Sequence, residues 1–228
     1  SFPESAHRGD AAVVDESGRP LGSCGDPSLP TFLRSAAKPF QALPLVEGGG
    51  IEKFRLTNAD LALICASHGG EPRHVRVVRR MLARGGFRIS DLECGADAPM
   101  DPASARALLR RGEKPSALHN NCSGQHAGLL LACRLFGFRS RGYIHPDHPL
   151  QAEIRRRVAA ETSTPERSIG IGVDGCNLPV FNIPLAGLAV GFAKLAAAGP
   201  VRAGEAETGD RALRARLWSA MCASPAMV

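Results

Sequence analysis

The feature that most constrains the fold is a series of helical segments that follow one another without regularly alternating strands. Proline is tolerable in a helix only in the first turn, so Pro39 places Ser35 at the entrance of one helix, and Gly137 closes another. The predicted helices span residues 35–46, 59–66, 72–83, 101–111, 123–136, 148–161, 185–198 and 210–222. Because strand patterns are few, the sequence predicts the α+β class and not a doubly wound sheet.

Strand patterns occur near both ends of the chain. Residues 11–14 and 19–21 are joined by a turn with Asp15 and Gly18, which predicts a β-hairpin. Residues 169–173 form a short apolar run that ends at Asp174, which predicts a buried strand that delivers a loop.

The length and composition are those of one globular domain. A chain of 228 residues can bury roughly 70% of its unfolded surface in a single core, so we expect one domain over residues 1–228. There is no initiator methionine, and the chain stops directly after a helical pattern. We therefore expect both ends to be cut.

Two classes of partner are disfavoured by composition. The longest apolar stretch, residues 183–199, is interrupted by Pro184 and Lys194, so no membrane span is predicted. The net charge is +6, but the arginines are scattered and only 5% of residues are aromatic, which disfavours a nucleic-acid groove.

Seven irregularly spaced cysteines, in a chain too large to need disulfides, favour buried thiols and a reduced, cytoplasmic location.

A Ser-x-x-Lys motif stands at one predicted helix start. Residues three apart share a helix face, so the Lys38 amine could approach the Ser35 hydroxyl and act as its base. Backbone N–H groups of the first turn would offer an oxyanion site. Alone, this common spacing is better explained by a capping serine and a solvated lysine.

A second polar segment, residues 65–71, ends an apolar helix with Ser67 and two glycines. Ser67 could relay a proton between Lys38 and a leaving group, and the glycines would let the backbone approach a ligand. Taken alone, the segment is better explained as a helix C-cap.

Two cysteines lie in polar loops that contain glycine. Cys122 precedes a predicted helix, and Cys176 follows a predicted strand. Thiolates in such loops can bind zinc or be reactive, but no Cys-x-x-Cys or His-x-x-x-His spacing accompanies them. On these residues alone, two partly buried thiols are the better explanation.

Taken together, six ordered segments resemble the thermolabile type II L-asparaginases of the rhizobial type. These segments are ESAHRG at 4–9, RSAAKPFQ at 34–41, ASHGGE at 66–71, HNNCSG at 119–124, HPLQ at 148–151 and VDGC at 173–176. The resemblance implies a serine β-lactamase-like fold with helices packed on a mainly antiparallel sheet, hydrolysis of L-asparagine to L-aspartate and ammonia, and a homodimer. We also expect no organic cofactor and no nucleic-acid or membrane partner.

The resemblance also implies roles for individual residues. Ser35 matches the acyl-forming nucleophile, Lys38 its base, and Ser67 the hydroxyl of a second Ser-Lys pair. Substrate-binding roles fall on a further group, Arg34, His126 and Asp174, of which Asp174 would hold the substrate amine and the other two shape the pocket. Cys122 and Cys176 match two zinc ligands.

The chain departs from the family pattern at two places. Gln125 stands where the family has a zinc-binding lysine, and a neutral amide is a poorer zinc donor, so we expect weak or absent zinc. The family's second catalytic lysine lies in a segment that would follow Val228. Two alternatives therefore stay open: a related acyl-transfer hydrolase of another amide, and a catalytically silent binding or assembly subunit.

Overall fold

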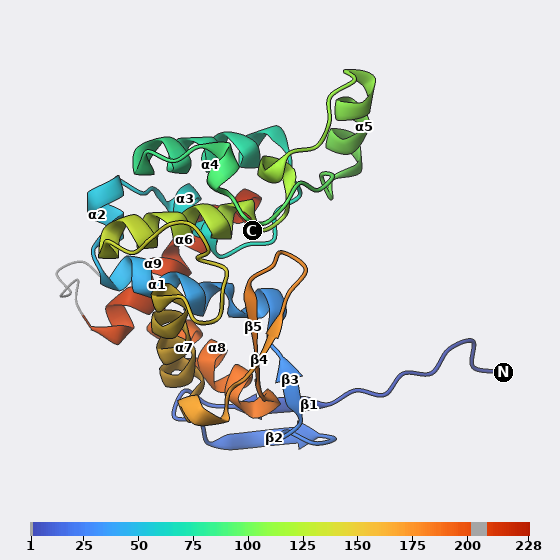
Figure 1. The fold of residues 1–228 in the computed structure, drawn as a ribbon. Helices are drawn as coiled ribbons and strands as arrows, with labels where there is room; N and C mark the ends of the chain where they lie inside the picture. The colour runs from blue at the N-terminus through green and yellow to red at the C-terminus, as the bar shows by residue number, and fades with distance from the viewer. Residues whose placement is uncertain (1, 202–208) are drawn as a thin grey trace.

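The computed structural model describes residues 2–201 and 209–228 as helices packed around small antiparallel sheets (Figure 1), which confirms the α+β class. The α-helices are α1 Lys38–Glu47, α2 Gly50–Phe54, α3 Asn58–Ile64, α4 Pro72–Gly85, α5 Pro102–Arg110, α6 Ser123–Phe136, α7 Pro149–Thr162, α8 Leu185–Ala198 and α9 Asp210–Ala223. The strands are β1 Ala11–Val14, β2 Pro20–Cys24, β3 Pro30–Phe32, β4 Gly170–Val173 and β5 Pro179–Pro184. Within these residues, no helix combines the length and apolar character that crossing a membrane requires.

The predicted hairpin is confirmed as β1 paired antiparallel with β2. Asp15 closes its turn, because one carboxylate oxygen accepts the backbone N–H groups of Ser17 and Arg19 at 3.0 and 2.9 Å. The hairpin packs against α8, at the opposite end of the molecule from α5 (Figure 1).

The second sheet has the order β3-β5-β4, and both pairings are antiparallel. The prediction that residues 169–173 form a buried strand is wrong in its burial. The strand exists as β4, but it lies at the edge of the sheet, and three of its four residues are exposed. Its partner β5 occupies the centre, and the turn between them points toward the helices (Figure 1).

The core is built around α1 and α6. Every residue of α1 from Lys38 to Val46 is buried, because the helix is enclosed by α7, α6 and α9. Pro39 lies in the first turn of α1, where proline is tolerated, whereas Pro44 lies inside the same helix and offers no backbone N–H there. Helix α6 is buried from Ser123 to Cys133 and packs against α4 as well as α1. The site described next lies where these two buried helices begin.

Candidate active site

Ser35 lies in a 3-10 turn, Arg34–Ala37, that joins β3 directly to α1. The strand fixes this turn, because the backbone N–H of Leu33 donates to the carbonyl of Phe181 in β5 at 2.9 Å. Arg34 has a φ of 45°, a left-handed conformation that costs a residue with a Cβ roughly 1–2 kcal/mol. Such strain is typical of functional positions, and here it immediately precedes the predicted nucleophile.

A chain of hydrogen bonds connects the three predicted catalytic side chains. The Ser67 hydroxyl donates to Ser35 Oγ at 2.8 Å, and Lys38 Nζ donates to Ser67 Oγ at 2.8 Å. The i, i+3 spacing in the sequence predicts that Lys38 approaches Ser35 directly. In the structure Ser67 stands between them, so a proton can pass from Ser35 to Lys38 through the Ser67 hydroxyl.

Lys38 is 2% exposed and is held by two further acceptors. Its Nζ donates to the carbonyl oxygen of Ala66 at 2.7 Å and lies 3.4 Å from Cys122 Sγ. Together with Ser67 these groups surround the buried Lys38 nitrogen with hydrogen-bonding partners, which offsets the cost of burying a polar group.

The segment that carries Ser67 is fixed against the start of α6. Gly70 has a φ of 75°, and a Cβ there would lie 2.8 Å from the carbonyl oxygen of His119, so only glycine fits. His68 is buried, with Nδ1 accepting the Gly70 N–H at 3.1 Å and Nε2 bonded to Ser123 Oγ at 2.9 Å. Burial is the main cause that lowers the pKa of His68 to about 3, so its ring is neutral and structural.

The two predicted metal-ligating cysteines are brought together beside Lys38. Cys122 directly precedes α6, Cys176 lies in the turn between β4 and β5, and both are buried free thiols. A hydrogen bond from the Cys176 side chain, followed by the charge of Lys38, lowers the pKa of Cys122 to about 6, and the same bond raises the pKa of Cys176. The Cys122 thiol therefore loses its proton more readily than an ordinary cysteine does.

Arg34 and Asp174 form an ion pair at the rim of the site. Arg34 Nη1 donates to Asp174 Oδ1 at 3.0 Å, and the two side chains are 73% and 22% exposed. The pair joins the turn that holds Ser35 to the β4–β5 turn that holds Cys176. Two predicted substrate-binding residues thus offer a cation and an anion that solvent can reach.

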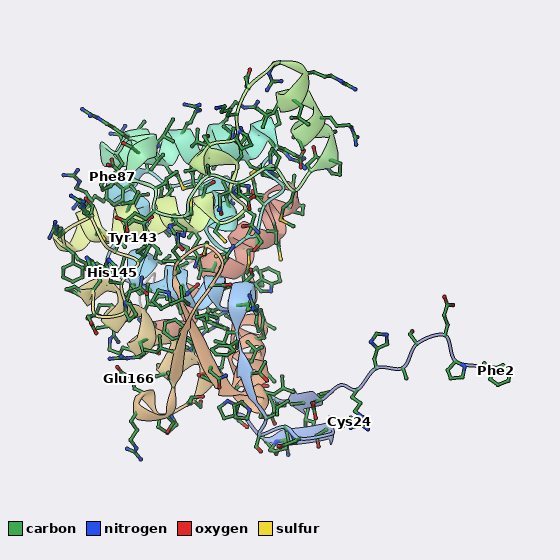
Figure 2. All side chains as sticks on the ribbon, turned by 45° about the vertical axis from the view of Figure 1, so that its right-hand side comes forward. Phe2, Cys24, Phe87, Tyr143, His145 and Glu166 are labelled. Atoms are coloured by element: carbon green, nitrogen blue, oxygen red, sulfur yellow. The ribbon has the colours of Figure 1, made fainter. Side chains whose placement is uncertain are left out.

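His126, the third predicted substrate-binding residue, has no exposed surface. Its Nδ1 lies 2.6 Å from the hydroxyl of Tyr143, which accepts the backbone N–H of Glu93 at 2.9 Å. Burial, and then the charge of Lys38, lower the pKa of His126 to about 3. Tyr143 is fully buried among the helices (Figure 2), and a substrate contact of His126 stays a prediction.

Two asparagines that sequence reasoning did not select hold the cysteine loops. Asn120 Nδ2 donates to the carbonyl of Cys94 at 3.0 Å, while its Oδ1 accepts the N–H of Cys122 at 2.9 Å. Asn177, with a φ of 70°, donates to the carbonyl of Glu93 at 3.0 Å. The available signal was an asparagine within two residues of each cysteine, because its short amide can hydrogen-bond nearby backbone and, at Asn177, tolerates a left-handed conformation.

Comparison with known families decides the relationship. The model of the family described as L-asparaginase II matches residues 1–228. The chain belongs to the L-asparaginase II family. It is therefore a hydrolase of the L-asparaginase type, as the ordered motifs implied. No curated protein matches the chain significantly.

The zinc site implied by the resemblance is not completed by the side chains of this L-asparaginase II family member. Gln125 replaces the expected lysine, and its Nε2 donates to Gln41 Oε1 at 2.5 Å inside the core. Among residues 2–201 and 209–228, no group of three or more His, Cys, Asp or Glu side chains is arranged to hold a metal ion. Zinc sites use at least three protein ligands. Cys122 and Cys176 alone do not meet this requirement, and no step proposed below passes through a metal.

We expect protein purified without chelator to contain substoichiometric zinc, and Gln125→Lys to raise its zinc content toward about one ion per chain. The new amine would supply a third donor near the two thiols. A missing ligand costs a zinc site several kcal/mol of a binding free energy of roughly 10–16 kcal/mol, so restoring a ligand should strengthen binding. Elemental analysis of the two proteins measures this, with Gln125→Met as the control that changes the side chain without adding a nitrogen donor. Stoichiometric zinc in the natural sequence, unchanged in Gln125→Lys, would contradict the expectation.

Proposed function

We propose that this protein hydrolyses L-asparagine to L-aspartate and ammonia through a covalent intermediate on Ser35. The observation that carries the proposal is the continuous hydrogen-bonded chain from Ser35 through Ser67 to the buried Lys38. A nucleophile, a relay and a base within hydrogen-bond distance are what acyl transfer requires. Membership of the L-asparaginase II family indicates the substrate class.

In the first step, Ser35 Oγ attacks the carboxamide carbon of the substrate. The hydroxyl proton of Ser35 moves to Ser67, and the Ser67 proton moves to Lys38, which must enter this step as the free amine. Ser35 lies in the 3-10 turn that leads into α1, and a backbone N–H group at the start of this turn could stabilise the oxyanion. The carbon–nitrogen bond then breaks, and the leaving nitrogen takes up the proton held by Lys38 and departs as ammonia.

In the second step, water attacks the ester carbon. The Ser67–Lys38 pair accepts the proton of the water and returns a proton to Ser35 Oγ as the ester bond breaks. Aspartate leaves, Ser35 regains its hydroxyl, and Lys38 is again the free amine. The same hydrogen-bonded chain thus serves as base and acid in both steps, as a shared intermediate requires.

The ion pair at the rim accounts for recognition of a free amino acid. The substrate carries an α-ammonium and an α-carboxylate. Its ammonium can replace Arg34 as the partner of Asp174, and its carboxylate can replace Asp174 as the partner of Arg34. The ammonium would bind Asp174 and the carboxylate Arg34, with the side-chain amide directed toward Ser35. Charge-assisted hydrogen bonds of this kind are about twice as strong as neutral ones.

Asp174→Asn is expected to raise KM for L-asparagine roughly 10- to 100-fold, because the substrate ammonium loses one charge-assisted hydrogen bond. Succinamate, which lacks the α-amino group, supplies the control: the substitution should change its KM little, because no ammonium contacts the carboxylate. Steady-state kinetics of both substrates with both proteins measures the difference. An equal change for the two amides would show that Asp174 acts only through Arg34 or the loop.

The proposal itself is tested by incubating the full-length protein with L-asparagine and measuring aspartate and ammonia, which should form in equal amounts. Other carboxamides, such as L-glutamine and a β-lactam, are measured alongside. Hydrolysis of one of these in place of asparagine would favour the related acyl-transfer enzyme. The absence of turnover with any amide would favour the silent subunit.

A further inference from the structure

A pocket lies between α4 and α5, away from Ser35. It has a volume of about 460 Å³, and its lining includes residues of both helices but none of Ser35, Lys38 and Ser67. Helix α5 stands apart from the body of the molecule beside α4 (Figure 1), and many side chains that project from the two helices end in nitrogen atoms (Figure 2). No role in the proposed hydrolysis accounts for this pocket.

The pocket is lined by hydrogen-bond donors without protein partners. Within residues 2–201 and 209–228, Arg79 has no hydrogen bond or ion pair, whereas the Ser104 side chain is hydrogen-bonded to Asp101. The Nδ1 of His119 accepts the backbone N–H of Ser116 at 3.0 Å, so the neutral ring carries its proton on Nε2, a second unused donor.

The charges at the pocket favour an anion. Arg111 is the second cation in its lining, and Glu113, the only acidic residue there among the described residues, is occupied by Arg111 at 2.7 and 3.2 Å. The pKa of His119 is lowered, first by partial burial and also by Arg79 and Arg111, so the imidazole faces a positive field. One guanidinium, that of Arg79, therefore remains unbalanced.

The rest of the wall is largely apolar. Val75 of α4 and Leu108 of α5 line it, together with Ala107. A bare inorganic ion would leave this surface in contact with water, whereas an anion with a short apolar body would cover it.

We propose that the α4–α5 pocket binds a small organic anion, a carboxylate on a short aliphatic or aromatic body. The carboxylate accepts from the Arg79 guanidinium and His119 Nε2, and the apolar body packs between Val75 and Leu108. Gly70 belongs both to this wall and to the segment that carries Ser67, so the pocket adjoins the candidate active site without sharing its side chains.

The test titrates butanoate into the isotope-labelled full-length protein at constant ionic strength and follows backbone amide resonances by NMR. We expect saturable shifts at residues of α4 and α5 that line the pocket, and none with butan-1-ol, which lacks the charge. Inorganic phosphate should bind more weakly than butanoate, because it leaves the apolar wall uncovered. No saturable shift, or equal shifts with the alcohol, would overturn the proposal.

Substitutions locate the anion. Arg79→Gln should weaken binding about tenfold, the loss of one charge-assisted hydrogen bond. Arg76→Gln, an exposed arginine one turn earlier on α4 that does not line the pocket, should bind as the natural protein does. Arg34→Gln should also retain binding. If Arg34→Gln abolished binding and Arg79→Gln did not, the anion would occupy the candidate active site, and the proposal would be wrong.

Discussion

Ser35→Ala is expected to lower kcat for L-asparagine by at least about 10⁴-fold, because the variant has no atom that can form the acyl bond. The fold should survive, since the hydroxyl accepts one hydrogen bond, from Ser67, and the turn is held by the backbone bond of Leu33. Steady-state ammonia release measures the loss. Ser90→Ala, an exposed serine remote from this turn, is the matched control and should keep the natural rate.

Retention of most of the rate by Ser35→Ala would remove this residue from the mechanism. The alternative nucleophile would then be the Cys122 thiol, which also contacts Lys38. Ser35→Cys separates the two cases. If Ser35 is the nucleophile, the new thiol can still attack and the pH profile of the rate should change, whereas a merely structural Ser35 would leave the profile unchanged.

Lys38→Arg is expected to lower kcat roughly 10²- to 10⁴-fold, the range of general acid–base catalysis. A guanidinium does not lose its proton, so it can still hydrogen-bond to Cys122 yet cannot act as a base. Lys53→Arg, at an exposed position, is the control and should have little effect.

A second variant distinguishes a base from a fixed charge. Lys38→Gln removes both functions, so it should fail whichever role the lysine has, whereas Lys38→Arg fails only if the proton matters. Urea unfolding of each variant checks that the larger or neutral side chain is accepted in a position only 2% exposed. Activity retained by Lys38→Arg and lost by Lys38→Gln would assign Lys38 an electrostatic role only.

Much of the helical framework could be predicted because local residues define its ends. Gly86 and Gly137 end α4 and α6 in the left-handed conformation, with φ of 69° and 71°, and Thr57 caps α3 with its side chain. The strands β3 and β5 were missed, because prolines at the ends of β5 resemble loop signals although they lie at the ends of its ladder. Their pairing depends on contacts between distant segments, which local patterns do not encode.

The site was predicted in composition but not in arrangement. The i, i+3 spacing correctly places Ser35 and Lys38 on neighbouring positions at a helix entrance. The position of Ser67 between them could not be read from that spacing, because it depends on how the end of α3 packs against α1. A catalytic lysine beyond Val228, a homodimer, a cytoplasmic location and a serine β-lactamase-like fold stay predictions.

The most direct test of the central claim is to capture the covalent intermediate. The full-length protein is mixed with L-asparagine, quenched in acid within the first turnovers, digested, and its peptides are measured by mass spectrometry. The account predicts a β-aspartyl ester on Ser35 in the natural protein, and no adduct on any residue in Ser35→Ala. An adduct on Cys122 or another side chain, or turnover with no adduct under conditions that trap an ester in a known acyl-enzyme, would contradict it.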